Sequence, residues 1–203
     1  MEALSTTDSK LFLFLNGLHT DWLDKVMVLI TDMWPWLPLY LLLIYWVVKQ
    51  YDKRSWWVFL TLGFVVLCSD QLSAHVCKPI FQRLRPCFNI DFQDIIHLPK
   101  GLAGGKYGFV SSHAANTFAI ATFLTPVLKT YRPWPAIALF SWAFISSYSR
   151  IYIGYHYPGD IIVGSILGIL VGWVFWKIFQ NMQKKIGIQN NEPIGGAAAS
   201  TLS

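Results

Sequence analysis

Long apolar segments alternate with short polar ones along most of this chain. A helix that spans the hydrocarbon core of a bilayer needs roughly 20 mainly apolar residues. Segments that approach this length are 34–48, 56–76, 109–128, 134–149 and 160–179. A further apolar segment, residues 22–30, contains Asp24 and Lys25, so it can cross the membrane, re-enter it or lie flat. The pattern predicts an all-α fold, a polytopic membrane helical bundle with five or six transmembrane helices.

The two ends of the chain differ from its apolar middle. Residues 8–19, DSKLFLFLNGLH, are apolar but too short to span, which predicts an N-terminal interfacial helix. Residues 181–203 are polar and end in GGAAASTLS, which is typical of a disordered tail. Because neither a repeat nor a linker-like tract interrupts the sequence between them, residues 1–180 are expected to form a single membrane-embedded domain.

Composition and charge support a membrane protein and indicate its orientation. Only 13% of the residues are charged against 54% hydrophobic, and soluble domains carry about twice that charged fraction. Alternating crossings place one set of basic residues on the same side of the membrane, with Asp52 among them: Lys49, Lys53, Arg54, Lys129, Arg132, Lys177, Lys184 and Lys185. By the positive-inside rule that side is cytoplasmic. The opposite side receives residues 77–108 and 150–159.

Three polar segments fall at this opposite side, because successive spans alternate in direction. They are KPIFQRLRP at 78–86, FVSSHAAN at 109–116 and SRIYIGYHYPGD at 149–160. The residues in them that carry chemistry are Lys78, Arg85, Ser111, Ser112, His113, Arg150, His156 and Asp160. The alternation predicts that these side chains converge at one end of the bundle.

The converging groups form the surroundings that a phosphate dianion requires. Three cations, two hydroxyls and the amides at the start of a helix all favour an anion. Without a ligand the cations would repel one another, at about 4 kcal/mol for a pair 4 Å apart at an effective dielectric near 20. His156 precedes Asp160 by four residues, so the carboxylate can bind one ring nitrogen and leave the other free as a nucleophile. His113 lacks a carboxylate at helical spacing and suits an acid or base.

The three segments together resemble the signature blocks of a known family. K-x6-RP at Lys78–Pro86, Ser-x-His at Ser111–His113 and SR-x5-H-x3-D at 149–160 are similar to those of the type 2 phosphatidic acid phosphatase superfamily, which also includes the vanadium haloperoxidases. The resemblance covers about residues 70–175. The middle block of the family is usually Pro-Ser-Gly-His, whereas here it is Val-Ser-Ser-His. We expect the serine that replaces glycine to reduce the room or to add a hydroxyl contact, without loss of activity.

The resemblance implies a role for each of these residues. His156 attacks phosphorus to form a phosphohistidine, and Asp160 holds its ring. His113 protonates the leaving oxygen and later activates water. The groups that bind the phosphoryl oxygens are Lys78, Arg85, Arg150, Ser111 and the backbone amide of Ser112. No metal or other cofactor is implied.

The predicted function is an integral-membrane, metal-independent phosphatase for a lipid phosphate or diphosphate, with its site on the extracytoplasmic face of a bacterial inner membrane. Candidate substrates are undecaprenyl diphosphate, phosphatidylglycerol phosphate, phosphatidate and lipid A phosphate. The expected partners are this lipid and the bilayer, not nucleic acid, and the oligomeric state is left open. A phosphate-lipid binding or transport protein without turnover and a vanadate-dependent haloperoxidase are the alternatives. Cys77 and Cys87 can pair only in an oxidising compartment, and unpaired thiols are the simpler alternative.

Overall fold

The computed structural model describes residues 2–128 and 132–186, and its regular elements in this part of the chain are helices. The longer ones are α1 (Glu2–Asn16), α2 (Asp21–Thr31), α3 (Leu37–Tyr51), α4 (Ser55–Gln71), α6 (Ser112–Val127), α7 (Trp134–Tyr152) and α8 (Pro158–Ile186). Each of the five predicted spans corresponds to one of the helices α3, α4, α6, α7 and α8, so the predicted all-α bundle is confirmed. Lys129 and the predicted tail beyond residue 186 lie outside the described residues.

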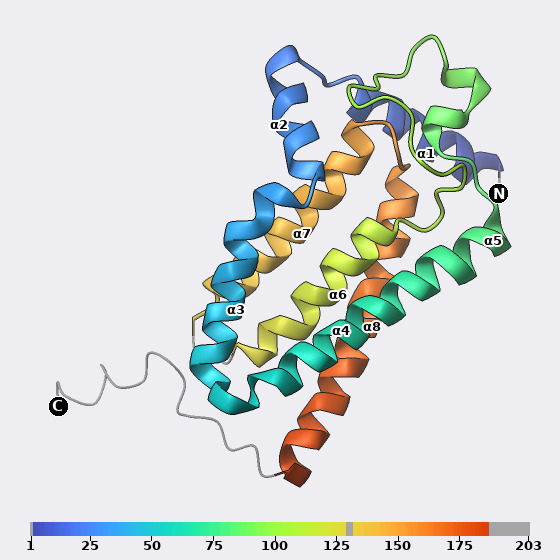
Figure 1. The fold of residues 1–203 in the computed structure, drawn as a ribbon. Helices are drawn as coiled ribbons and strands as arrows, with labels where there is room; N and C mark the ends of the chain where they lie inside the picture. Colours follow the sequence, from blue (N-terminus) through green and yellow to red (C-terminus); the bar gives the residue numbers. More distant parts are fainter. Residues whose placement is uncertain (1, 129–131, 187–203) are drawn as a thin grey trace.

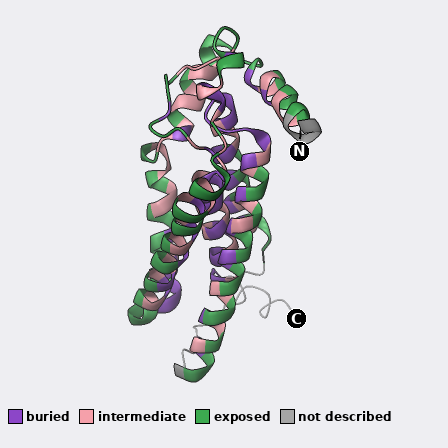
Figure 2. Ribbon diagram, turned by 90° about the vertical axis from the view of Figure 1, so that its right-hand side faces the viewer, coloured by how far each residue is buried: buried purple, intermediate pink, exposed green. Residues whose placement is uncertain are grey.

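Helix α6 is the centre of the bundle. It packs against α4, α7 and α8 (Figure 1), and none of its residues from Ser112 to Val127 is exposed. Figure 2 shows the buried positions concentrated in the interior of the bundle, while exposed positions line its outer helices. Many of these exposed side chains are large and apolar, among them Leu41 and Leu42 on α3 and Ile162, Ile166 and Leu170 on α8. An apolar exterior of this kind suits a lipid environment and not water.

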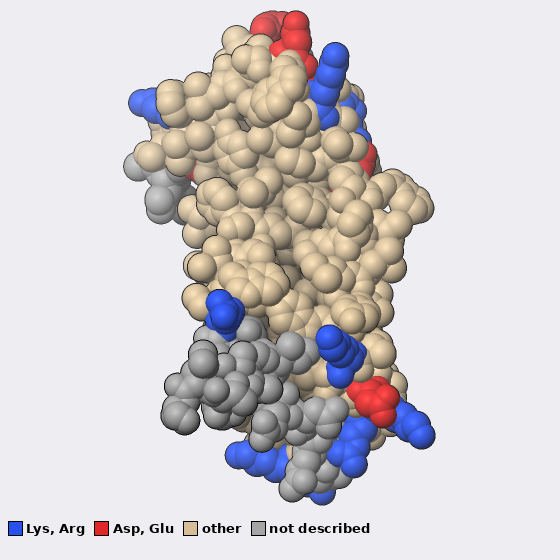
Figure 3. Space-filling view, turned by 90° about the vertical axis from the view of Figure 1, so that its left-hand side faces the viewer, with Lys and Arg blue, Asp and Glu red and all other residues tan. Residues whose placement is uncertain are grey.

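Within residues 2–128 and 132–186, two helical segments are long and apolar enough to cross a membrane, namely Trp34–Phe81 and Pro158–Lys185. The first is not one straight helix, because the chain reverses at Asp52, whose φ is +46°. It therefore consists of α3 and α4 side by side (Figure 1). On the face seen in Figure 3, a broad band without charged side chains separates the two ends of the molecule.

Helix α2 leads into α3 in the same direction along the bundle (Figure 1), with the turn Trp34–Trp36 between them. Pro35 lies in this turn and has no backbone N–H to donate, which favours a break between the two helices. Residues 22–30 thus extend the path of α3 and pack against α7. The number of membrane crossings stays a prediction.

The N-terminal helix is longer than predicted and packs on the protein. It runs from Glu2 to Asn16, where the sequence predicted residues 8–19, and it lies across the upper end of the bundle (Figure 1). Phe12 is completely buried there, stacked with Phe92 and edge-on to Tyr157. Protein contacts therefore hold at least one face of α1.

Helix α8 continues past the boundary that composition suggested at residue 181. It ends at Ile186, and Gln183 in its last turns is buried with its amide 3.5 Å from the Tyr51 hydroxyl. Residues 181–186 belong to the bundle because they continue a helix that already packs on α4 and α6. The composition becomes polar at residue 181, but the helix does not end there, so composition alone places the boundary too early.

Close packing of α6 on α8 depends on glycines at four-residue spacing. The sequence predicted such a small-residue stripe at Gly164, Gly168 and Gly172, and α6 is the neighbour that approaches it. A Cβ atom at Gly168 would lie 2.2 Å from the carbonyl oxygen of Ala115, closer than any real contact. The two backbones therefore touch over this length.

We expect Gly168→Ala to lower the free energy of unfolding by about 1–3 kcal/mol, because the added methyl forces α6 and α8 apart. Gly63→Ala on α4 is the matched control, since a Cβ there meets nothing within 4 Å. Its effect should be neutral or stabilising by up to about 1 kcal/mol through helix propensity. Thermal unfolding of the purified proteins in detergent measures both, and equal Tm values for the two variants would contradict the close contact.

Candidate active site

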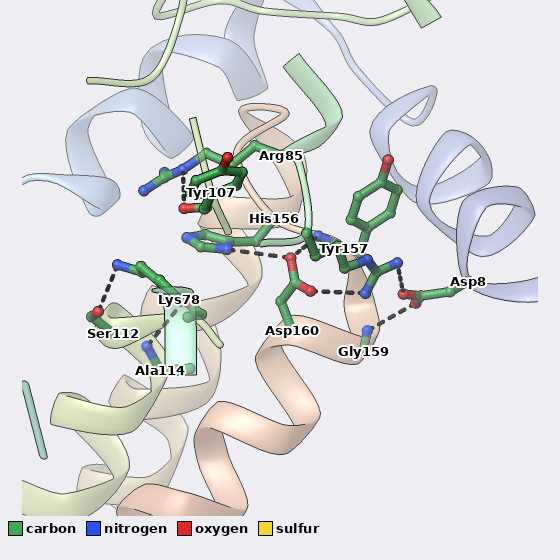
Figure 4. A network of polar contacts seen from close by, with 12 residues as sticks. Asp8, Lys78, Arg85, Tyr107, Ser112, Ala114, His156, Tyr157, Gly159 and Asp160 are labelled. Carbon is green, nitrogen blue, oxygen red and sulfur yellow. Dashed lines mark hydrogen bonds and ion pairs between the residues drawn. The ribbon is translucent and has the colours of Figure 1, made fainter. Parts of the chain in front are cut away.

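The three polar segments meet at the upper end of the bundle (Figure 4). A turn of π-helix, Leu72–Cys77, extends α4 and delivers Lys78 at the start of the short helix α5 (Lys78–Phe81). Such turns are rare and often occur at functional sites. The second segment opens α6, and the third runs from the end of α7 to the first turn of α8. The backbone N–H of Ser111 donates to the carbonyl of Asp160 over 3.1 Å, which joins the second segment to the third.

His156 and Asp160 form a buried pair. The Nδ1 atom of His156 lies 3.4 Å from Oδ2 of Asp160, and both side chains are almost fully buried. This distance is long and the contact does not have hydrogen-bond geometry, so Nδ1 is a buried atom without a hydrogen-bond partner in the described part of the chain. Catalytic contacts are often long before substrate binds. The arrangement keeps Nδ1 facing a carboxylate, and the opposite nitrogen, Nε2, stays available for chemistry.

Burial is the main cause that lowers the pKa of His156 to about 4, although the nearby carboxylate of Asp160 acts to raise it. The cations of Arg85 and Arg150 contribute to this lowering. The imidazole is therefore neutral at pH 7, with a free lone pair. A neutral imidazole beside cations is the form that can attack an electrophilic phosphorus.

Asp160 is fixed by more than His156. Its Oδ2 atom accepts a hydrogen bond from the backbone N–H of Tyr157 over 3.0 Å, and its Oδ1 atom accepts one from Arg83 over 2.8 Å. The side chain is 0% exposed, so its charge needs this compensation. The sequence analysis did not select Arg83.

His113 lies in the first turn of α6, and its Nε2 atom is 2.9 Å from the hydroxyl of Ser146 on α7. It interacts electrostatically with both Arg150 and His156. The structure thus brings together the two histidines that the sequence selected, at the same end of the bundle. Ser146 was not selected, because a serine within an apolar helix carries no signal of its own.

The serine that replaces the usual glycine adds a hydroxyl contact. Ser112 Oγ accepts hydrogen bonds from the Lys78 ammonium and from the Ser73 hydroxyl, both over 2.9 Å. This is one of the two outcomes expected from the sequence. Ser111, in contrast, caps α6: its buried hydroxyl accepts from the Ala114 N–H over 3.4 Å. Its hydroxyl already has a structural partner.

Arg85 and Arg150 lie on either side of the site and share one aromatic ring. The Arg85 Nε–H donates to the carbonyl of Tyr107 over 3.2 Å, and the Arg150 Nη1–H donates to the hydroxyl of Thr31 over 2.8 Å. Their guanidinium carbons lie 6.0 and 5.0 Å from the centre of the Tyr155 ring.

These cations interact with one another as well as with their neighbours. Lys78 is within electrostatic reach of Arg85 and Arg150. The Nε–H of Arg150 is buried and has no hydrogen-bond partner in the described part of the chain. A buried donor of this kind among mutually repelling cations suits an anionic ligand.

The described residues contain neither a metal-ligand cluster nor a disulfide. No three His, Cys, Asp or Glu side chains of residues 2–128 and 132–186 gather in a way that could hold a metal ion. Cys68, Cys77 and Cys87 are free thiols, which is the simpler of the two arrangements considered from the sequence.

Comparisons with known proteins identify the family. The model of the PAP2 superfamily matches residues 54–184. A lipid A 4'-phosphatase of Bacteroides thetaiotaomicron is 33% identical over 201 residues, which cover 98% of this chain and 88% of that protein. The chain therefore belongs to the PAP2 superfamily, as its three signature blocks indicated.

Solved structures share the fold. The crystal structure of Aquifex aeolicus LpxE superposes with a TM-score of 0.66 at 25% identity, over 83% of this chain and 93% of that one. A transmembrane PAP2-type phosphatidylglycerolphosphate phosphatase from Bacillus subtilis gives a TM-score of 0.65 at 22% identity, over 92% of this chain and 89% of that one. The bundle is thus an integral-membrane fold, and the chain is a phosphatase that acts on membrane lipids.

The low pKa of His156 has a measurable consequence. The value of kcat/KM reports the ionisation of groups in the free enzyme. Protonation of His156 should therefore lower the wild-type kcat/KM only as the pH approaches about 4. Asp160→Asn removes the carboxylate that raises this pKa, so the variant titrates at still lower pH and is up to about 10⁴-fold less active. The ratio of wild-type to variant kcat/KM, in which substrate ionisation cancels, should stay level down to about pH 5.5 and fall towards pH 4. A ratio that already falls at pH 6.5 would contradict the burial of His156.

Proposed function

We propose that this protein hydrolyses a lipid phosphate without a metal ion, through a phosphohistidine formed at His156. The observation that carries the proposal is the neutral, buried imidazole of His156, which faces Asp160 through Nδ1 while a group of cations surrounds it. This combination supplies a nucleophile and charge compensation for the group being transferred.

In the first step, Nε2 of His156 attacks phosphorus and a P–N bond forms. The bond from phosphorus to the lipid oxygen breaks, and its electron pair stays on that oxygen, which takes a proton from His113. The lipid alcohol leaves. Asp160 stabilises the positive charge that the phosphorylated imidazole acquires, through Nδ1. In-line transfer of this kind depends mainly on positioning and electrostatics.

In the second step, water attacks the phosphohistidine. His113, now neutral, accepts a proton from the water as the new P–O bond forms and the P–N bond breaks. His156 recovers its lone pair, inorganic phosphate leaves and His113 is protonated again for the next cycle. One base therefore serves in both steps, and the hydroxyl of Ser146 orients its ring.

The remaining groups hold the phosphoryl oxygens. Lys78, Arg85 and Arg150 neutralise the charge on those oxygens, and the unpartnered Nε–H of Arg150 supplies a free donor. The Ser112 N–H, at the first position of α6, adds a donor at the positive end of a helix. Ser111 supports this turn by capping it.

We propose lipid A phosphate, among the candidate lipids, as the substrate. The similarity to the Bacteroides thetaiotaomicron protein named lipid A 4'-phosphatase extends over nearly the whole chain and supports this choice. The proposed location is a bacterial inner membrane, with the site on the periplasmic face. In support of this orientation, the turn and helix ends far from the site carry Lys49, Lys53, Arg54, Lys184 and Lys185, and blue side chains gather at the lower end in Figure 3.

A phosphate-release assay with excess EDTA tests the mechanism. Lipid A, phosphatidate, phosphatidylglycerol phosphate and undecaprenyl diphosphate are offered to the purified protein and to its histidine variants. We expect phosphate release to be fastest from lipid A. The rate of release should fall at least about 10³-fold in His156→Ala and about 10²–10⁴-fold in His113→Ala. With ³²P-labelled substrate, an acid-labile and base-stable phosphoprotein should form in the wild type and be absent from His156→Ala.

The control is His75→Ala, since His75 is an exposed histidine at the same end of the bundle, and its activity should stay near that of the wild type. Full activity of His156→Ala, or loss of activity on adding EDTA, would overturn the mechanism. Binding of all four lipids without release would favour a carrier, and vanadate-dependent bromide oxidation would favour a haloperoxidase. A higher kcat/KM for another lipid would overturn only the choice of substrate.

A further inference from the structure

A second ion-pair system lies behind the His156 and Asp160 pair. The guanidinium of Arg83 donates through Nη1 to Oδ1 of Asp160 over 2.8 Å and through Nη2 to Oδ2 of Asp8 over 2.6 Å. One cation thus connects a carboxylate at the start of α8 to one on the N-terminal helix α1. Figure 4 shows Asp8 and Asp160 gathered on the same side of His156.

Asp8 also contacts α8 directly. Its Oδ1 atom accepts a hydrogen bond from the backbone N–H of Gly159 over 2.8 Å. The approach is so close that a Cβ on Gly159 would lie 2.8 Å from Oδ2 of Asp8, and only glycine leaves this room. A carboxylate at a helix N-terminus is favourable, because the free amides there carry partial positive charge. Asp8 is therefore held by two independent contacts.

Arg83 is fixed in the same way from several directions. Its guanidinium carbon lies 4.0 Å from the centre of the Tyr157 ring, a cation–π contact. Its backbone carbonyl accepts the N–H of Gly108 over 2.9 Å. The side chain is 27% exposed and that of Asp8 is 16% exposed, so neither is a freely solvated surface charge.

The consequence for catalysis comes through Asp160. Its carboxylate is completely buried, and Arg83 is the cation that forms an ion pair with it. With Oδ1 bound by Arg83 and Oδ2 bound by the Tyr157 N–H, the carboxylate plane is fixed and Oδ2 faces Nδ1 of His156. Without Arg83, Oδ1 would lose a charge-assisted hydrogen bond and the carboxylate would be free to rotate.

We propose that Arg83 and Asp8 are positioning residues for the phosphoryl transfer assigned above, on which this inference rests. Arg83 aims Asp160 at His156, and Asp8 holds Arg83. Helix α1 is thereby part of the active-site structure, although Asp8 lies outside residues 54–184, the segment that the family model matches.

The competing explanation is that Arg83 binds a lipid headgroup, as an exposed basic residue near the membrane surface would. A headgroup contact acts on substrate binding, so its loss raises KM. A positioning contact acts on the orientation of the nucleophile, so its loss lowers kcat. The two explanations also differ in whether the effect of Arg83 requires Asp160.

The decisive experiment is a double-mutant cycle with Arg83→Gln and Asp160→Asn, measured as lipid phosphate release. Lys106→Gln is the matched control, because Lys106 is an exposed cation in the same loop. We expect Arg83→Gln to lower kcat about 10–100-fold with little change in KM, as small misplacements at catalytic groups do. In the Asp160→Asn background the same substitution should have less than about a 3-fold effect, because its target is gone. Lys106→Gln should leave kcat unchanged.

The pH profile gives a second readout. The charged and titratable groups that face His156 are Asp160, Arg85, Arg150 and His113, and all remain in the Arg83→Gln variant. Removing Arg83 leaves the charge of Asp160 less compensated, so imidazolium at His156 is favoured. The acid limb of kcat/KM should therefore move to higher pH, and Arg83→Lys, which keeps a cation, should move it back.

Several results would overturn the inference. A raised KM with unchanged kcat would assign Arg83 to the headgroup, and a lower Tm with wild-type kcat would leave it a purely structural role. If Arg83→Gln does not fold, Asp8→Asn decides instead, because its amide oxygen still accepts from the Gly159 N–H while the charge and the acceptor that face Arg83 are lost. A kcat about 3–10-fold below wild type supports the inference by the same argument, and a wild-type kcat ends it.

Orthovanadate separates a failure of this inference from a failure of the proposed function. It mimics the transferred phosphoryl group, and its binding is measured as a rise in Tm without any turnover. If the wild type binds vanadate but releases no phosphate from any lipid, the proposed function fails. The inference is then judged by vanadate affinity alone, which Arg83→Gln should weaken and Lys106→Gln should not.

Discussion

The backbone contact between α6 and α8 is the constraint on which the rest of the site depends. His113 opens one of these helices, and Asp160 stands in the first turn of the other. Because the glycines of α8 let the two backbones touch, the helix starts lie side by side, and the Ser111 N–H reaches the Asp160 carbonyl. A larger separation would move His113 away from Asp160, since each is fixed to its own helix.

Charge balance is the second constraint, and it follows from the first. Bringing the helix starts together encloses a carboxylate and several cations where water is scarce, so each charge needs a partner. Asp160 has Arg83, and Lys78 has the Ser112 hydroxyl. Arg150 retains an unpartnered buried N–H, so the described groups do not complete the balance. Under the proposed function, a phosphate dianion would supply the missing charge and acceptors, and its release would restore the initial imbalance.

Much of the bundle and its site was predictable from the sequence, because both leave local signals. Apolar runs gave the five helices α3, α4, α6, α7 and α8, and alternation of their direction put the three polar segments at one end. Arg83 was not predictable in this way, since it lies in a loop with other basic residues such as Lys106 and nothing local distinguishes them. Its partners are 75 positions before it and 77 after it, so only the folded chain reveals the contact.

The long reach of Asp8 has a consequence for biosynthesis. Its contact with Gly159 joins positions 151 apart, so α1 must wait for α8 to be synthesised before it finds its place. Contacts of such sequence separation close late, after the local helices have formed. A nascent chain that has emerged only as far as α7 therefore has no assembled catalytic centre. Maturation of the enzyme is tied to the arrival of α8.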